Sequence, residues 1–303
     1  MYYFLSLLTG ILISVMIAFN GGLTNQYGVY SATVIIHIVG LVLITIVVLA
    51  KREKPITTGK PQFAANGQPY PAADSERRAW FLYLGGAIGV LTTIFNNFAF
   101  GRISVSAILA LGLFGQSIAG LVIDQNGFFG MPKHLFSRRK LIGLALILAG
   151  IASMINNFEI IAVVISFIAG VTIVLSRTLN AKLADLTSMR ISTFYNYLVG
   201  LFVSIPVFLL LGRNEINLSE FAISPNWFLY LGGVLGVGVV LLSNITVMKV
   251  SAFYLTLLIF IGQVFSGIVI DLVISRELSI RILIGGLFVV LGLTINLILD
   301  RKR

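Results

Sequence analysis

Ten apolar stretches of about 20 residues, separated by short polar segments, make up most of the 303-residue chain. A helix of about 20 apolar residues crosses the roughly 30 Å hydrocarbon core of a bilayer. The pattern therefore predicts an all-α integral membrane protein with ten transmembrane helices. The predicted spans are 4–24, 31–50, 79–99, 104–124, 139–156, 159–179, 191–211, 227–247, 252–273 and 281–299.

One polar segment is much longer than the others. Residues 51–78 contain four prolines and scattered charges, with little apolar content to pack, so we expect a mobile cytoplasmic loop. The N-terminus reads MYYFLSLLTG, without a basic leader or a small-residue cleavage site. We therefore interpret 4–24 as a retained first span and not as a removable signal peptide.

The stretch from Trp80 to Asp124 occurs twice in the chain. Laid without a gap over Trp227 to Asp271, it matches at 18 of 45 positions. The matches include Trp, Asn, Gln and Asp, which a shared apolar composition would not produce. Upstream, a shift of 160 residues aligns Asn20 with Asn180, and downstream a shift of 142 aligns the last spans.

The repeat divides the chain into two five-helix units, residues 1–156 and 157–303. Because five is an odd number of crossings, the second unit enters the membrane in the opposite sense, which is the inverted repeat of many transporters. The predicted loops on one face hold 17 of the 21 Lys and Arg residues. The positive-inside rule then places both termini in the cytoplasm.

The composition agrees with a membrane protein. The chain is 58% hydrophobic and 11% charged, with a mean hydropathy of +1.01, which excludes an ordinary soluble protein. Its net charge of +10 reflects the basic loops and does not indicate nucleic-acid binding. With no Cys and two His, we expect no disulfide, metal site or cofactor. The spans also have no carboxylate near their centres that could act in catalysis, so we do not expect an enzyme.

Polar side chains inside the spans are the candidates for a binding site, because in hydrocarbon they must face other helices or a cavity. Gln116 and Gln263 lie near the middle of equivalent spans, and four asparagines also form repeat pairs. Two interpretations stay open for these residues: hydrogen-bonding between helices, and contact with a substrate. The predicted substrate-binding residues are Gln116, Gln263, Asn97, Asn244, Asn20 and Asn180.

Three ionisable residues in or near the spans, His37, Asp124 and Asp271, are candidates for gating or coupling. His37 is either a satisfied hydrogen-bonding group or a proton relay. Asp124 and Asp271 end equivalent spans, and each either rests at the interface or closes its side of a pathway against nearby Arg and Lys. We interpret Arg177, about a turn from the predicted end of its span, as a residue that snorkels to the interface and fixes orientation.

These motifs resemble a known family. Each unit has an early Asn in its first span, the opening WFLYLGG at 80–86 or 227–233, and a GQ to ID segment at 115–124 or 262–271. The first unit continues into the turn GFFG at 127–130. Together these features resemble the YdcZ-type family of the drug/metabolite transporter superfamily, here as two five-helix units fused in tandem.

The resemblance implies a central cavity lined by helices one, three and four with their counterparts six, eight and nine, and peripheral helices five and ten. It also implies an inner-membrane transporter. The small multidrug-resistance branch carries a Glu in its first helix, whereas this chain has Asn20 there. That difference argues against proton-coupled cation export by the mechanism of that branch.

We therefore expect a secondary transporter that exports a small organic metabolite by alternating access around a midplane site. A neutral, hydrogen-bonding site favours a zwitterionic or uncharged polar solute. The expected partners are this solute and the lipid bilayer, with no nucleic acid, and a homodimer is compatible with the sequence. The alternative is a non-transporting scaffold or accessory subunit whose polar residues only hold helices together.

Overall fold

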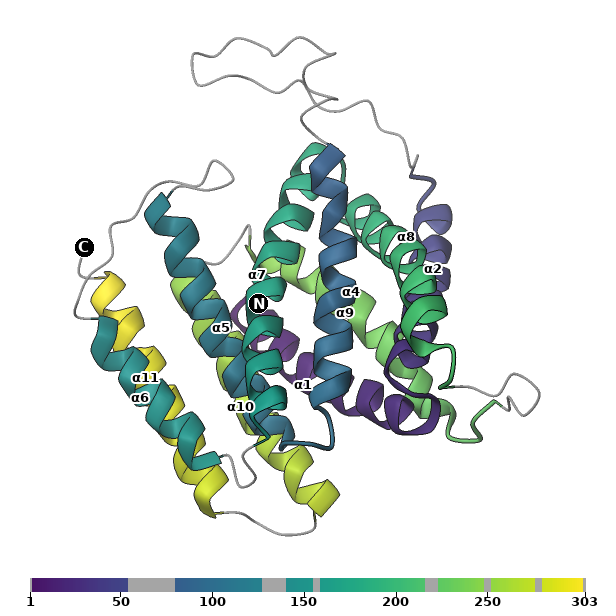
Figure 1. The fold of residues 1–303 in the computed structure, drawn as a ribbon. Helices are drawn as coiled ribbons and strands as arrows, with labels where there is room; N and C mark the ends of the chain where they lie inside the picture. The colour runs from purple at the N-terminus through teal and green to yellow at the C-terminus, as the bar shows by residue number, and fades with distance from the viewer. Residues whose placement is uncertain are drawn as a thin grey trace, which may run out of the picture.

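The computed structural model describes residues 2–53, 80–126, 140–154, 159–215, 223–247, 252–275 and 280–301. Nearly all of the predicted loop 51–78 lies outside the described residues. The described chain folds into ten α-helices, and no strand is present in these ranges (Figure 1). The helices are α1 (Tyr2–Tyr27), α2 (Val29–Ala50), α4 (Leu84–Ala99), α5 (Val105–Asn126), α6 (Lys140–Met154), α7 (Ile160–Leu186), α8 (Met189–Val207), α9 (Leu231–Val247), α10 (Ala252–Ser275) and α11 (Ile280–Arg301).

Three shorter helices extend this set. The two WFLYLGG motifs begin as single 3₁₀ turns, η1 (Trp80–Tyr83) and η4 (Trp227–Tyr230), which lead directly into α4 and α9. A short π-helix, η3 (Phe208–Gly212), continues α8 beyond Pro206. Proline removes a backbone donor and disturbs the preceding turn, which accounts for the irregular end of α8.

The ten predicted spans correspond one to one with the ten helices. Seven of the described segments are long and apolar enough to cross a membrane, and three shorter apolar helices cover 141–154, 258–274 and 280–296. Large apolar side chains face outward, for example Leu210 and Phe202 with exposed fractions of 81% and 79%. Such faces suit lipid and not water. The protein is therefore a multi-pass membrane protein.

The largest error in the predicted spans is at the end of α7, which was expected near 179 and is at Leu186. Asn180, Lys182 and Asp185 end the apolar run, but polar residues of this kind do not end a helix. The chain turns only at Ser188, whose side chain accepts a hydrogen bond from the backbone N–H of Ile191 (3.1 Å) and caps α8.

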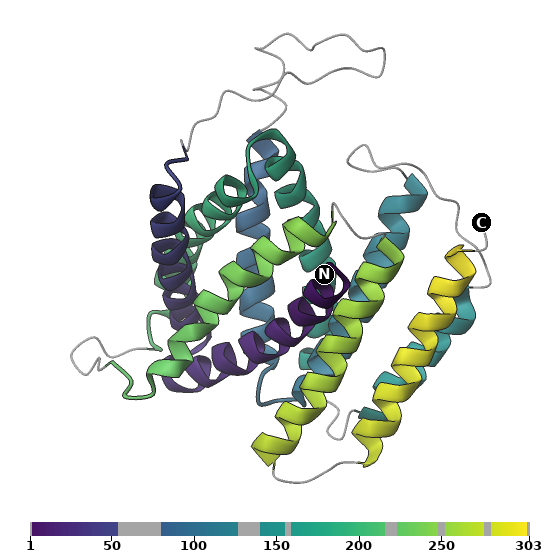
Figure 2. The same cartoon turned by 180° about the vertical axis from the view of Figure 1, so that it is seen from behind.

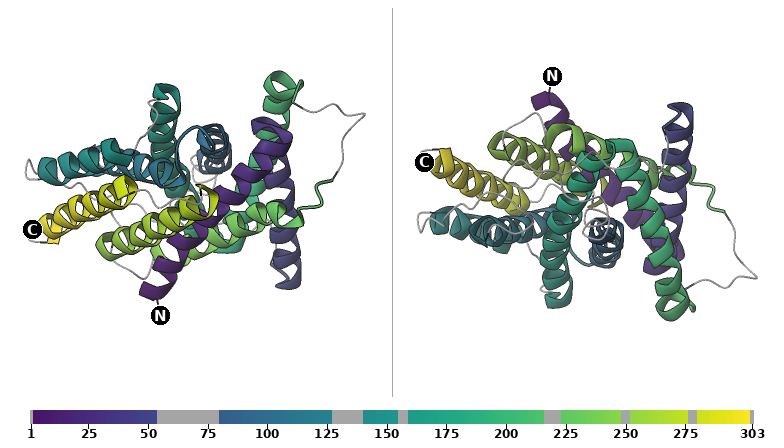
Figure 3. Two further views of the ribbon diagram at one scale, coloured as in Figure 1. Left: turned by 90° about the horizontal axis from the view of Figure 1, so that it is seen from below. Right: turned by 90° about the horizontal axis from the view of Figure 1, so that it is seen from above.

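The helices form a six-helix group with two further pairs beside it. In the group, α4, α7 and α8 pack against one another, as do α1, α2 and α9. Figure 1 shows the first three toward the viewer, and Figure 2 shows the second three from behind. Helices α5 and α10 lie beside this group, and α6 and α11 form an outer pair, as the views along the vertical direction also show (Figure 3).

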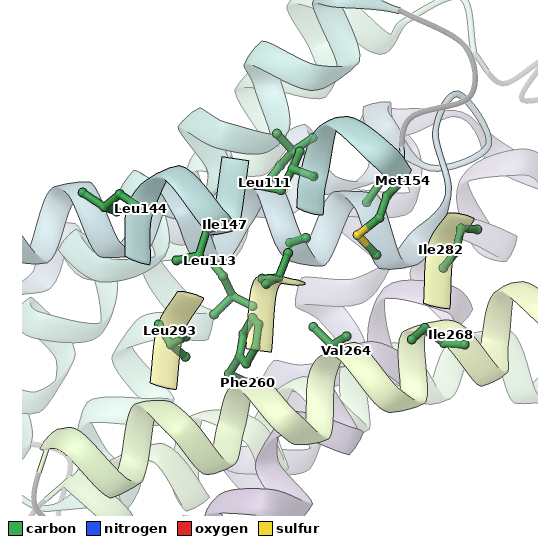
Figure 4. Packing of buried hydrophobic residues seen from close by; sticks show 14 residues of the cluster. Leu111, Leu113, Leu144, Ile147, Met154, Phe260, Val264, Ile268, Ile282 and Leu293 are labelled. Atoms are coloured by element: carbon green, nitrogen blue, oxygen red, sulfur yellow. The ribbon is translucent and has the colours of Figure 1, made fainter. Parts of the chain in front are cut away.

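A buried apolar cluster attaches the outer pair to α5 and α10. Leu113 of α5 and Phe260 of α10 meet residues such as Ile147 of α6 and Leu293 of α11 (Figure 4). Because lipid is as apolar as these side chains, their contribution comes from close packing and not from removal from water.

Glycines allow two helix pairs to approach backbone to backbone. A methyl group on Gly170 of α7 would lie 2.7 Å from the carbonyl carbon of Gly112 in α5. One on Gly10 of α1 would lie 2.9 Å from the carbonyl carbon of Ile259 in α10. These contacts are equivalent under the sequence repeat, since Gly10 aligns with Gly170 and Gly112 with Ile259. The α1–α10 and α7–α5 interfaces therefore repeat one geometry.

Candidate functional site

A cavity of about 160 Å³ lies inside the six-helix group. Its described lining of 21 residues comes from α1, α2, α4, α7, α8 and α9. Twenty of these residues form ten pairs that the sequence repeat makes equivalent, with Ile173 as the remaining one. The resemblance implied that α5 and α10 would line the central cavity, but at this cavity α2 and α8 take those places.

All four predicted asparagines line the cavity as two repeat pairs, Asn20 with Asn180 and Asn97 with Asn244. Each is buried, with exposed fractions of 2% to 6%. The structure therefore brings these four side chains together, although they come from four different helices.

Asn20 and Asn180 both pack closely against a neighbouring helix, but of the two only Asn180 forms a side-chain hydrogen bond to another helix in the described part of the chain. The amide oxygen of Asn180 faces Gly85 of α4, and that of Asn20 faces Gly232 of α9, so closely that neither glycine has room for a methyl group. The Nδ2 group of Asn180 donates to Asn196 Oδ1 (2.7 Å). These contacts agree with the helix-packing interpretation, while the position in the lining leaves the substrate interpretation open as well.

Asn97 and Asn244 differ although they are equivalent in sequence. Asn97 Nδ2 donates to the hydroxyl of Thr33 on α2 (3.3 Å). The Nδ2 group of Asn244 is buried and has no hydrogen-bond partner among the described residues, and the same holds for Oδ1 of Asn20. A buried amide atom without a partner costs about 1–3 kcal/mol, so a polar solute that pairs with Asn244 or Asn20 would recover part of this cost.

Neither predicted glutamine is among the residues that line this cavity. Gln263 is 2% exposed and lies where α10 touches α1. Its backbone carbonyl oxygen accepts a hydrogen bond from Ser14 Oγ (2.9 Å). Its side-chain Oε1 has no partner. Gln116 is partly exposed on α5. The repeat predicts a shared depth in the bilayer for the two glutamines, but depth does not determine which helices enclose the cavity.

His37 lines the cavity opposite its repeat partner Tyr197, with ring centroids 5.8 Å apart. Its Nδ1 is 2.7 Å from the carbonyl oxygen of Thr33. A carbonyl can only accept, so Nδ1 carries the proton in this contact. In the neutral ring the other nitrogen, Nε2, is then free to accept a proton.

Two carboxylates, Asp271 and Glu215, cap helices of the opposite repeat, and a third, Glu53, binds side chains at the start of another. Asp271, at the end of α10, accepts from the backbone N–H groups of Val105 (2.7 Å) and Ser106 (2.9 Å) at the start of α5, and also from the Ser106 hydroxyl. This is an N-terminal cap, which favours a negative charge. The equivalent Asp124 side chain lies outside the described part of the structure. The basic residues expected to pair with the two aspartates were Arg138, Arg139 or Lys140 for Asp124 and Arg276 or Arg281 for Asp271; of their side chains only that of Arg281 is described, and it is exposed.

Glu215 and Glu53 form a similar reciprocal pair that the sequence did not reveal. Glu215 follows α8 and accepts from the first backbone N–H groups of α2, including those of Val29 (2.9 Å) and Ser31 (2.9 Å). Gly28, with φ of +87°, has no side chain that would collide with this carboxylate. Glu53 follows α2 and binds the start of α8.

The start of α8 lowers the pKa of Glu53. Burial by itself raises this pKa, but the hydrogen bond from Ser188 (2.7 Å) and the hydrogen bond and charge of Arg190 outweigh it. The net pKa lies below its ordinary value. Glu53 is therefore charged at neutral pH, and its ion pair joins the end of α2 to α8.

Arg177 was predicted to mark the end of a span, but it lines the cavity. It lies nine residues before the end of α7, or about 13 Å along the helix at 1.5 Å per residue. The error followed from placing the end of the span too early. A cavity expected to be neutral therefore contains a guanidinium group.

Packed clusters flank the cavity at both ends. At one end the hydroxyl groups of Tyr27 and Tyr230 are 2.6 Å apart, and both accept from the backbone N–H of Ser224. At the other end, Tyr83 and Tyr195 stack edge to face with centroids 4.8 Å apart over Leu183. Tyr83 and Leu183 are the repeat equivalents of Tyr230 and Leu23, and Leu23 belongs to the first cluster.

Comparisons with known proteins agree with this architecture. The family model described as "Putative inner membrane exporter, YdcZ" matches residues 1–153 and again 161–295. Among curated proteins, none matches the chain. A crystal structure that is 15% identical in sequence superposes with a TM-score of 0.62, and the alignment covers 99% of each chain. At this identity the likeness establishes the fold alone.

Proposed function

Because the chain belongs to the YdcZ family of the drug/metabolite transporter superfamily, we propose that it is a secondary transporter that exports a small organic metabolite by alternating access around the six-helix cavity. The observation that carries the proposal is the composition of the cavity lining. Twenty of its residues are ten repeat-equivalent pairs, the arrangement expected where a binding site lies on the axis between two halves.

The two halves would be inverted in the membrane. Each contact of α1 with α9 and α10 has its counterpart in the contacts of α7 with α4 and α5, which suits a two-fold relation. Each half contains five helices, so its ends lie on opposite membrane faces if every helix crosses. A two-fold axis in the membrane plane meets both conditions, and the distribution of Lys and Arg supports cytoplasmic termini.

The end clusters suggest how access alternates. The Tyr27–Tyr230 cluster and the Tyr83–Tyr195 cluster share the repeat-equivalent pairs Tyr230 with Tyr83 and Leu23 with Leu183, so opening one cluster while the other stays packed would exchange the roles of the halves. In this mechanism each cluster is a gate. His37 is the proposed coupling group, because it lines the cavity with Nε2 available for a proton. For Asp271 we propose a structural role and not a coupling role, because it caps the start of α5 and so holds α10 against α5.

Reconstitution tests the proposal against the alternative of a scaffold. Liposomes containing the full-length chain are loaded with a panel of small metabolites, and release is followed with and without a pH gradient. If the protein is a transporter, its liposomes release at least one solute faster than loaded liposomes without protein. Asn244→Ala should lower that release rate by about tenfold, the equivalent of one or two lost hydrogen bonds. Asn126→Ala, which removes an exposed amide at the end of α5, is the matched control.

Site-specific labelling tests the gates independently of the substrate. The chain has no Cys, so a single Cys at Leu23 or at Leu183 reports one gate each. An impermeant maleimide should reach position 23 from one membrane face only and position 183 from the other. Labelling of both positions from the same face would overturn the inverted arrangement, and failure to transport any solute would favour the scaffold.

A further inference from the structure

The walls of the cavity differ in polarity even though their residues are equivalent in position. We call α4, α7 and α8 the polar wall, and α1, α2 and α9 the apolar wall. In five of the ten repeat pairs, an apolar residue on the apolar wall corresponds to a polar residue on the polar wall. These pairs are Met16 with Ser176, Ile17 with Arg177, Ile36 with Asn196, Val239 with Thr92 and Val240 with Thr93.

Arg177 gives the polar wall a positive charge. The described cavity lining contains no Asp or Glu. No hydrogen bond or ion pair joins the guanidinium of Arg177 to another described group. Its repeat partner on the apolar wall is Ile17, so the charge lies to one side of the cavity and not on its axis.

The described carboxylates are committed elsewhere. An uncompensated guanidinium in the membrane is costly, so such a residue normally pairs with an anion or faces a water-filled space. Asp185 is exposed two turns farther along α7. The other described acids bind different groups: Glu53 binds Ser188 and Arg190, Glu159 pairs with Arg102, Glu215 caps α2, and Asp271 caps α5.

We propose, as an extension of the proposed transport function, that the cavity binds a small amphipathic monocarboxylate. Its carboxylate pairs with Arg177 on the polar wall, where the planar guanidinium offers two parallel donors to two oxygens. Its apolar part lies against Met16, Ile17 and Ile36. The buried, unpartnered Nδ2 of Asn244 supplies a further donor.

Charge and size exclude several other solute classes. A cation would meet Arg177 without any described acidic partner, and the ammonium group of a zwitterion would also lack one. A phosphate dianion would find one compensating charge where it needs two. The cavity volume of about 160 Å³ is close to that of a protein cavity of about 150 Å³ that holds benzene. We therefore expect a solute of roughly six to nine non-hydrogen atoms.

Benzoate, benzamide and benzylamine test this inference because they share one ring and differ in charge. Binding of each to purified full-length protein in lipid nanodiscs is measured by isothermal titration calorimetry at neutral pH. Benzoate should bind at least about tenfold more tightly than benzamide, as expected for a charge-assisted pair, and benzylamine should bind most weakly. Arg177→Gln should remove the preference for benzoate over benzamide, and Arg177→Lys should keep part of it.

The control variant is Arg281→Gln, which removes an exposed arginine of α11 and should leave the order of the three ligands unchanged. Equal binding of benzoate and benzamide, an unchanged preference in Arg177→Gln, or no saturable binding of benzoate would each overturn the inference. Because these titrations need no gradient, their outcome is separate from that of the transport assay. If the protein binds carboxylates at Arg177 but transports no solute, the proposed transport function is wrong and the binding site at Arg177 is still supported.

Discussion

The backbone contact between α5 and α7 gives the sharpest test of the fold. Gly170→Ala places a methyl group 2.7 Å from the carbonyl carbon of Gly112 and still closer to its oxygen, whereas ordinary contact begins at 3.4 Å. The helices must therefore separate by at least the difference, 0.7 Å. A gap of this size forfeits about a quarter to a half of each dispersion contact.

The expected loss can be worked out from this separation. About 20 close atom pairs, each worth about 0.15 kcal/mol, would lose roughly 1 kcal/mol, and overpacking strain adds about 1–3 kcal/mol. Against this, Ala favours the helix over Gly by about 0.5–1 kcal/mol. The net loss in the free energy of unfolding should be about 1–3 kcal/mol relative to the parent.

Gly120→Ala is the matched control, because it lies on α5 and no described atom comes within 4 Å of an added methyl group. It should be neutral or slightly stabilising. Thermal unfolding of the purified protein, followed by the fluorescence of Trp80 and Trp227, should place Gly170→Ala about 2–12 °C below this control. Gly10→Ala, at the equivalent α1–α10 contact, should fall by a similar amount. If Gly170→Ala melts at or above Gly120→Ala, the two backbones do not approach as described.

Three further predictions follow from single contacts. Because the pKa of Glu53 is lowered in the folded state, its contribution to stability is complete above the unfolded value of about 4.3 and is lost as the pH falls through the folded value. The melting temperature of the parent should therefore converge in acid with that of Glu53→Gln, and parallel curves would contradict this ion pair. Gln263→Ala should lower the melting temperature but leave the benzoate affinity unchanged, since Gln263 does not line the cavity. A change in affinity would show that Gln263 takes part in ligand binding. Tyr230→Phe removes one of two hydroxyls at its gate, and the loss of about 1 kcal/mol should speed maleimide labelling of a Cys at position 23 about fivefold, whereas an unchanged rate would show that the hydroxyl does not hold this gate.

Most of the helices could be predicted from the sequence because an apolar run of sufficient length has few alternatives in a membrane. The asparagines of the cavity were also predictable, since the repeat identified them as pairs. The end of α7 was not, because hydropathy measures where the chain leaves hydrocarbon and not where the helix stops. That error carried over to Arg177, which seemed to lie at an interface when it belongs to the cavity lining.

Contacts between the repeats could not be predicted in the same way. Glu215 and the start of α2 are separated by more than 180 residues, and no local pattern marks an acid as the cap of a distant helix. The glutamines illustrate the same limit. The repeat predicts equal depth for the two residues, but whether α5 and α10 or α2 and α8 enclose the cavity depends on three-dimensional packing.

The reciprocal contacts of Glu53 and Glu215 suggest which parts of the molecule move together. Glu53 and Glu215 join α2 and α8 at both ends of that helix pair, and separating the pair would leave charged groups and helix termini without partners. By contrast, the gate at Tyr27 and Tyr230 rests on a few hydroxyl and ring contacts, each worth about 1 kcal/mol. Under the proposed mechanism, opening a gate would therefore be the cheaper change, and α2 with α8 would be the fixed element around which it occurs. The repeat would then supply two equivalent states, while the unequal walls of the cavity would orient the solute in the same way in both.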